Sequence, residues 1–100
     1  MSIVKDKSDD GTTLTLFLPE KFDFKLFSDF RSSYEKEEKV GKTILDMHKT
    51  QYMDSSALGM LLQLKEHADK NKGKISLRNV NKNISDILHV AHFHKLFSIS

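Results

Sequence analysis

Two hydroxyls and a carboxylate stand together at Asp54-Ser55-Ser56, where an apolar strand candidate gives way to an amphipathic helix candidate. The first turn of a helix leaves backbone N–H groups without partners, and with the helix dipole they favour negative charge. A serine here can cap the helix, or it can accept a phosphate whose charge the helix start tolerates. The spacing therefore predicts a helix cap or a site that another protein modifies.

Covalent catalysis by Ser55 would need a hydrogen-bonded base and an oxyanion hole. The segment is not a Gly-x-Ser-x-Gly motif, and the histidine in the same loop is His48. The sequence also lacks a glycine-rich phosphate loop. We therefore predict that this chain is neither a serine hydrolase nor a nucleotide hydrolase, and that it is not an enzyme.

Three histidines, His89, His92 and His94, gather near the C-terminus, with Asp86 just before them. Asp86 and His89 would share a helix face, whereas His92 and His94 fall beyond the predicted helix. Zinc sites usually combine three or four converging ligands with supporting hydrogen bonds. The pattern favours histidines at a surface helix end, and we predict no metal and no cofactor.

Basic and acidic residues are interleaved along the chain, with 16 Lys and Arg against 14 Asp and Glu and a net charge of +2. The lysine-rich stretches Lys36–Lys42 and Lys70–Lys74 carry acidic residues in or beside them. Nucleic-acid binding normally needs a basic face or stripe. We therefore expect solvated surface lysines, no nucleic-acid partner and a monomer.

The absence of cysteine excludes disulfides and thiolate metal sites. The start of the chain, Met1–Asp6, has no basic segment followed by a long apolar run, so we expect no secretory signal. No apolar stretch approaches the ~20 residues that a membrane helix needs. We expect a cytoplasmic protein that does not associate with membranes.

The first half of the chain reads as two strands and a helix. Asp9-Asp10-Gly11 is a turn signal between strand candidates at Ile3–Lys5 and Thr12–Leu18, and Pro19 closes the second. A helix is expected from Phe24 to about Glu38. Its apolar face would carry Phe27, Phe30 and Tyr34.

The second half begins with a buried strand candidate at Thr43–Met47, followed by the strongest helix, from Ser55 to about Asn71. Its stop signal is Asn71-Lys72-Gly73. The expected apolar stripe of this helix is Leu58, Leu61, Leu62 and Lys65, continued by Ala68 and widened by Met60 and Leu64.

A short strand is expected at Lys74–Asn79 and a last one at Leu96–Ile99, on either side of a third helix capped by Asn81 or Asn83. That helix would carry Ile84, Ile87, Leu88 and Ala91. The order β-β-α-β-α-β-α-β predicts one α/β domain over residues 1–100, with amphipathic helices packed on a mixed sheet.

The sequences Ile44-Leu45-Asp46-Met47 and Tyr52-Met53-Asp54-Ser55-Ser56-Ala57-Leu58-Gly59 resemble the signature of STAS domains, specifically the bacterial anti-sigma factor antagonists. In that family an apolar strand ends in Asp, and a loop leads to Met-Asp-Ser-Ser-Gly-Leu-Gly at a helix start. The likeness extends to Glu20-Lys21-Phe22-Asp23, in place of a Gly-x-Leu-Asp element, and to Ile84–Phe97.

The resemblance implies a phosphorylation switch in which the unmodified protein binds an anti-sigma factor that is also a serine kinase. Phosphorylation of the first serine after the motif Asp, here Ser55, releases the partner, and a PP2C-type phosphatase resets the switch. Ser56 is the second choice as acceptor. The expected contact surface is Lys49–Asp54, the first turns of the following helix, and Lys21–Phe24. The residues expected to bind the partner are Asp23, Tyr52, Met53, Asp54, Ser56, Ala57 and Leu58.

Two positions depart from the family pattern. The glycine of the motif is Ala57, and the glycine of the loop before the last strand is His92. Asp23 can be a loop or cap carboxylate or a contact near the acceptor, and Asp46 is expected to be structural. The alternative function is a phosphorylation-independent scaffold, or a module that senses a small ligand on the same fold.

Overall fold

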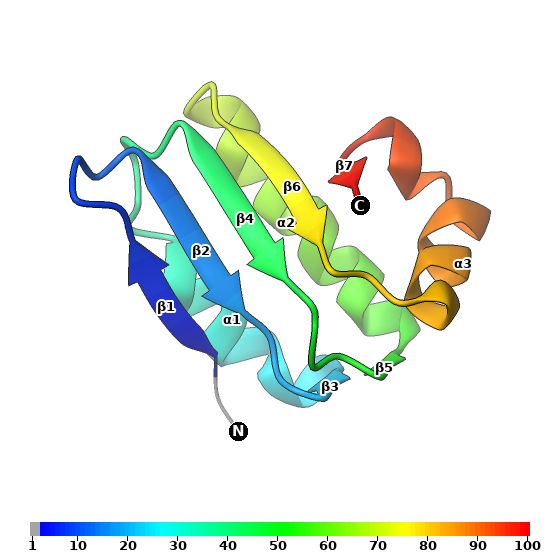
Figure 1. Ribbon diagram of the computed structural model, residues 1–100. Helices are drawn as coiled ribbons and strands as arrows, with labels where there is room; N and C mark the ends of the chain where they lie inside the picture. The colour runs from blue at the N-terminus through cyan, green and yellow to red at the C-terminus, as the bar shows by residue number, and fades with distance from the viewer. Residues whose placement is uncertain (1–2) are drawn as a thin grey trace.

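The computed structural model describes residues 3–100 and contains a five-stranded sheet in the order β1-β2-β4-β6-β7 (Figure 1). β1 runs antiparallel to β2, and the other neighbours are parallel. The predicted α/β fold with a mixed sheet is confirmed. The strands are β1 (Val4–Lys7), β2 (Thr13–Phe17), β4 (Lys42–Asp46), β6 (Lys74–Arg78) and β7 (Ser98–Ile99).

A second, two-stranded parallel sheet joins β3 (Lys21–Phe22) to β5 (Tyr52–Met53). The backbone N–H groups of Gln51 and Tyr52 both donate to the carbonyl of Glu20, at 2.8 and 3.1 Å. The sequence did not predict these strands, because two residues are too few to show the alternation by which strands are recognised. This small sheet holds two loops together that are far apart in the sequence.

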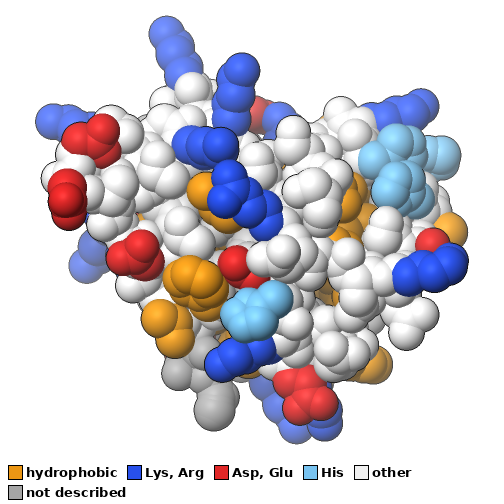
Figure 2. Space-filling view, viewed as in Figure 1, with side chains coloured by type: hydrophobic (Ala, Val, Ile, Leu, Met, Phe, Trp, Pro, Cys, Tyr) orange, Lys and Arg blue, Asp and Glu red, His pale blue; other side chains and the backbone are white. Residues whose placement is uncertain are grey.

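The helices are α1 (Phe27–Tyr34), α2 (Ser55–Lys70) and α3 (Lys82–Val90), with short 3-10 turns η1 (Phe24–Leu26) and η2 (Phe93–Lys95). In Figure 1, α1 and α2 lie together behind the large sheet, while α3 and η2 lie at its β7 edge. Within residues 3–100, no helix covers the other face of the sheet. Figure 2 shows this open face, where Lys and Arg side chains gather over its middle.

The core lies between the sheet and the pair α1 and α2. Alternate residues of the strands point into it, as Leu14, Leu16, Leu45 and Leu77 do, all without exposed surface. Rings from β3 and α1 pack against one another in tilted and edge-on contacts, with 5.2 Å between the centroids of Phe22 and Phe30 and 5.5 Å between those of Phe30 and Tyr34. The buried stripe of α2 is Ala57, Met60, Leu61, Leu64 and Ala68.

The apolar stripe predicted for α2 was rotated away from the one that is buried. Leu62 is 46% exposed, and Leu58 and Lys65 are half-buried. Met60 and Leu64, expected only to widen the stripe, are fully buried because α2 packs on α1 as well as on the sheet. The physical reason is that the Ala, Leu and Met residues of this helix form a band wider than one buried stripe, so the pattern alone does not fix the rotation of the helix.

Several element ends also differ from the predicted ones. α1 ends at Tyr34 and not at Glu38, β1 continues to Lys7, and the last strand begins at Ser98 and not at Leu96. The third helix is capped by Asn81, whose side chain accepts a 2.9 Å hydrogen bond from the backbone N–H of Ile84. At the end of α2 the left-handed residue is Lys72, with φ of 57°, and not Gly73.

Candidate functional site

Helix α2 begins at the predicted junction, and its cap is Asp54, not a serine. Asp54 has an extended backbone, and its Oδ1 accepts a 3.1 Å hydrogen bond from the backbone N–H of Ala57. The same oxygen accepts a 2.6 Å hydrogen bond from the Ser56 hydroxyl. Asp54 therefore satisfies one of the free N–H groups of the helix start and also fixes the second serine.

The two serines of the motif have different environments. Ser55 is the first residue of α2 and is exposed, and its hydroxyl has no hydrogen-bond partner among residues 3–100. Ser56 is half-buried, and its hydroxyl donates to the Asp54 carboxylate. A protein that approaches from solvent therefore meets the Ser55 oxygen first, and without breaking a bond inside the domain.

The Asp54 carboxylate is stabilised in its charged form. The hydrogen bond from the Ser56 hydroxyl is the largest cause that lowers the pKa of Asp54, and the N–H groups of Ala57, Ser56 and Phe24 act in the same direction. The N–H group of Phe24 belongs to η1, so the start of that turn also favours the charged form of this carboxylate. The site thus carries a fixed negative charge next to Ser55.

The small sheet brings the Lys21–Phe24 segment beside the motif, as expected. The backbone N–H of Asp54 donates to the carbonyl of Phe22 over 3.4 Å. Asp23 caps η1, because its Oδ1 accepts a 3.0 Å hydrogen bond from the backbone N–H of Lys25. The cap interpretation of Asp23 is therefore the one that its contact supports.

The predicted partner-binding residues fall into two groups. Tyr52 is 50% exposed, and Asp54, Ser56 and Leu58 are half-buried at the rim of the junction. Met53 and Ala57 point into the core, so their side chains are not available to a partner. These two residues position the loop and the helix instead.

An apolar surface next to Ser56 was missed by the sequence reasoning. Phe24 and Phe27 are 64% and 41% exposed. They line a shallow hollow of about 420 Å³ with Ser56, Gly59, Met60 and Gln63. The spacing of Phe27 to Phe30 and Tyr34 predicts that Phe27 lies on the buried face of α1, and this prediction is wrong because the Phe27 side chain is 41% exposed. The available signal was the presence of two phenylalanines so close together at a helix start.

His48 is engaged elsewhere in the loop. Asp46 Oδ1 accepts hydrogen bonds from the backbone N–H of His48, at 3.0 Å, and lies 2.9 Å from His48 Nδ1. Burial opposes the charged form of Asp46, but these bonds and one from Asn79 lower its pKa on balance. Asp46 is thus a structural residue at the end of β4, as expected, and His48 is not oriented as a base for Ser55.

The C-terminal histidines form a ring cluster. The His89 and His94 rings stack with 4.6 Å between centroids, and His92 lies in the left-handed region with φ of 63°. In the described part of the chain, no group of three or more His, Cys, Asp or Glu residues is arranged to hold a metal ion. Nor does any helix of residues 3–100 have the length and apolarity to span a bilayer.

The structure is a small α/β domain that presents an exposed serine at the start of α2. The model of the STAS domain family matches residues 4–100, and the chain belongs to this family. A STAS-domain containing protein of Pseudomonas aeruginosa (strain UCBPP-PA14) is 40% identical over 101 residues, covering 100% of both chains.

Solved structures with the same fold include SpoIIAA, an anti-sigma factor antagonist. Its unphosphorylated form matches with a TM-score of 0.75 at 15% identity, covering 99% of this chain and 87% of that one. The phosphorylated form of SpoIIAA from Bacillus matches with a TM-score of 0.77 at 15% identity, covering 99% and 91%. A sulfate transporter family protein from Wolinella succinogenes matches with a TM-score of 0.77 at 18% identity, covering 84% and 70%.

Proposed function

We propose that this protein is a non-catalytic regulatory switch that binds a partner when Ser55 is unmodified and releases it when Ser55 is phosphorylated. The observation that carries the proposal is the contrast between the two motif serines. Ser55 is exposed with a free hydroxyl among the described residues, whereas the Ser56 hydroxyl is bound to Asp54 at 2.6 Å. A kinase would have to break that bond to use Ser56, so Ser55 is the better acceptor.

The surface around Ser55 suits a protein partner. Phe24 and Phe27 expose apolar rings beside the first turns of α2, and Tyr52 adds a half-exposed ring on the adjacent loop. Aromatic side chains of this kind are typical of the buried centre of protein interfaces. A partner seated on these rings would cover the helix start, and with it the acceptor hydroxyl.

Phosphorylation of Ser55 adds about −1.5 to −2 charges. The free N–H groups of the helix start favour that charge by roughly 0.3–1 kcal/mol, while the adjacent Asp54 repels it, so the fold itself should tolerate the phosphate. An apolar interface would bear the main penalty, because burying an unpaired charge costs several kcal/mol. A hundredfold loss of affinity needs only about 2.7 kcal/mol.

The proposed partner is an anti-sigma factor or a serine kinase of the partner-switching type, and a PP2C-type phosphatase would restore the free hydroxyl. SpoIIAA, an anti-sigma factor antagonist with the same fold, supports this class of partner. Its unphosphorylated and phosphorylated forms both match this fold closely, which supports a switch that works without refolding. ATP and Mg²⁺ would belong to the kinase, and this chain would need no cofactor.

The first experiment maps phosphorylation by peptide mass spectrometry on protein purified from its own cells. Wild type, Ser55→Ala and Ser56→Ala are compared. We expect phosphate on the motif peptide of wild type and of Ser56→Ala, and none on Ser55→Ala. Phosphate that persists in Ser55→Ala but is lost in Ser56→Ala would move the acceptor to Ser56. No phosphate in any growth condition would reject the switch.

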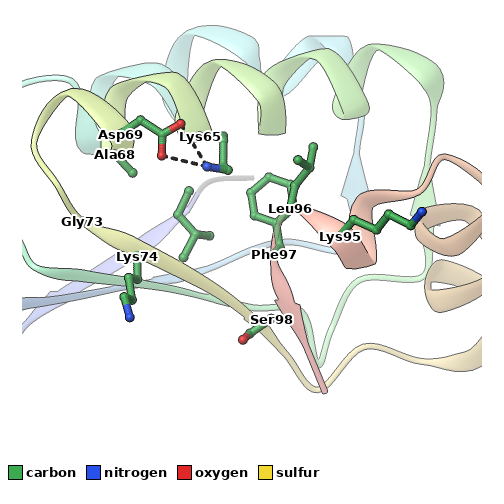
Figure 3. Close-up of a pocket in the computed structure, with 10 residues that line it drawn as sticks. Lys65, Ala68, Asp69, Gly73, Lys74, Lys95, Leu96, Phe97 and Ser98 are labelled. Carbon is green, nitrogen blue, oxygen red and sulfur yellow. Dashed lines mark hydrogen bonds and ion pairs between the residues drawn. The ribbon is translucent and has the colours of Figure 1, made fainter.

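A second candidate function is the sensing of a small ligand, and one cleft favours it. The cleft has a volume of about 440 Å³ and lies between the C-terminal half of α2 and the β6–β7 edge. Figure 3 shows the Phe97 ring pointing into this cleft near the ion pair of Lys65 and Asp69. The Nζ atom of Lys65 lies 2.7 Å from Oδ1 and 2.9 Å from Oδ2 of Asp69. The switch predicts opposite partner binding by Ser55→Ala and Ser55→Asp, whereas a sensor or scaffold predicts no difference between them.

A further inference from the structure

The open face of the large sheet carries a set of basic side chains that the switch does not use. On β4 and β6, the residues that alternate with the core positions point to this face, and they include Lys42, Lys74 and Arg78. Figure 2 shows Lys and Arg side chains gathered over this part of the sheet, above an apolar side chain. The acceptor serine, by contrast, belongs to α2 on the opposite side of the sheet (Figure 1).

Two of these cations are placed directly against each other. Lys42 and Lys74 are in register on neighbouring parallel strands, and both are exposed. Like charges directly opposite each other destabilise a sheet. Among residues 3–100, neither lysine nor Arg78 forms an ion pair with an acidic side chain. Asp46 is in register with Arg78, but its carboxylate is bonded to His48 and Asn79.

The residues between the cations on this face include groups that an extended chain can contact. Ile44, which lies between Lys42 and Asp46 on β4, is only 7% exposed although it does not belong to the core between sheet and helices. Ser76 and Ser98 are in register beside it and add hydroxyls in the same row. This face thus has a nearly covered isoleucine at its centre, hydroxyls next to it, and cations at both ends.

The spacing of the cations specifies their counterpart. Lys74 and Arg78 are four residues apart on one strand, hence about 13 Å apart at ~3.3 Å per residue. An extended acidic segment has the same rise, so its side chains at positions i and i+4 reach both cations, and a neighbouring carboxylate reaches Lys42. We propose that this face, defined by Lys42, Lys74, Arg78 and Ile44, docks an extended acidic segment of a partner protein.

An acidic peptide fits this face better than a nucleic acid. A nucleic-acid surface requires a longer basic track, and the whole chain carries a net charge of only +2. The neighbouring strand on the same face offers Thr13, Thr15 and a half-buried Phe17, so no fully exposed ring is available for bases to stack on. Peptide carboxylates need only the two or three ion pairs that this face provides.

The test is a titration of the ¹⁵N-labelled protein with octaglutamate, followed by NMR amide shifts at low salt, with octaglutamine as the uncharged control peptide. We expect the largest shifts on β4 and β6 and weakening by added salt. Lys42→Ala/Lys74→Ala should weaken binding about fivefold, since each exposed ion pair lost is worth roughly two- to threefold. Lys36→Ala/Lys39→Ala removes the same charge from an exposed loop, and it should weaken octaglutamate binding less than twofold.

Equal weakening by the two double variants would overturn the proposal, because binding would then follow net charge alone. Shifts confined to other surfaces would also overturn it. A single-stranded DNA oligonucleotide of equal charge that binds tighter than octaglutamate would reassign the face to nucleic acid, and dimerisation in ultracentrifugation that Lys42→Ala/Lys74→Ala abolishes would reassign it to a second copy. Ser55→Asp should leave octaglutamate binding unchanged, because Ser55 does not belong to this face. Failure of the docking proposal can therefore be distinguished from failure of the switch.

Discussion

Gly59 lies inside α2, one turn after Ser55 on its exposed side, and the fold gives no reason for a glycine there. A Cβ built at this position meets nothing within 4 Å, and its backbone is ordinary helix. Glycine inside a helix is about 0.5–1 kcal/mol less favourable than alanine. Gly59→Ala should therefore stabilise the free domain by that amount, which for a domain of this size corresponds to roughly 2–8 °C in Tm.

Gly73 provides the matched control, because the same substitution there should have the opposite sign. A Cβ at Gly73 would lie 2.9 Å from the backbone oxygen of Val40, which cannot rotate away. We expect Gly73→Ala to destabilise the domain by about 1–3 kcal/mol, in the range of overpacked sites. Urea unfolding followed by circular dichroism measures both variants on the same scale.

Gly59→Ala should change the stability of the free domain and its affinity for the partner in opposite directions. If the helix surface at Gly59 is kept bare so that a partner can approach Ser55 closely, the variant will be more stable and will bind the partner less tightly. If Gly59→Ala lowered the free energy of unfolding, the conclusion that the helix surface at Gly59 has room for a Cβ would be wrong. A stabilised variant with unchanged partner affinity would refute close approach at this position.

Three further predictions concern local geometry. His92→Gly should stabilise the domain by about 1 kcal/mol, seen as a higher urea midpoint, because His92 occupies a left-handed conformation with φ of 63°. Thr50→Val should cost about 0.5–1.5 kcal/mol in the same assay, because the fully buried hydroxyl donates a 3.0 Å hydrogen bond to the Pro19 carbonyl. The lowered pKa of Asp54 means that its stabilising contribution is present above the ordinary value of 3.8 and is lost as pH falls through the native pKa. Asp54→Asn should keep the cap but remove this part of the acid dependence in a pH series of thermal melts, whereas Asp54→Ala should lower Tm even at neutral pH.

The sequence predicted the elements that repeat a long pattern. The sequence was sufficient to predict β2, where Leu14 and Leu16 alternate with polar residues, and α2, which is long. In both elements the burial of one face repeats over many residues. The small sheet of β3 and β5 was not predictable in this way, since its two residues per strand are held by pairing across the fold. That pairing is what carries the Lys21–Phe24 segment to the motif.

The sequence predicted that the motif stands at a helix start, but it did not predict the contacts of the motif residues. A carboxylate and two hydroxyls at a helix start indicated a cap, an acceptor or both, but the assignment needed hydrogen bonds that only the fold supplies. Asp54 caps the helix and accepts a hydrogen bond from the Ser56 hydroxyl, whereas the exposed Ser55 takes no part in the cap. The exposure of Phe24 was likewise not predictable from the sequence, because a ring at the start of a helix can point toward the core or toward solvent with the same spacing.

The arrangement of the two proposed surfaces determines how they can influence each other. Ser55 begins the helix that covers one face of the sheet, and Lys42 and Lys74 lie on the other face, with the core between them. A phosphate on an exposed serine is screened within about 8 Å at physiological ionic strength. A close-packed core does not transmit a local charge as a shape change unless it has two arrangements. Phosphorylation of Ser55 should therefore release a partner from the helix start and leave an acidic segment on the open face undisturbed, so that the domain stays attached to one partner while it exchanges another.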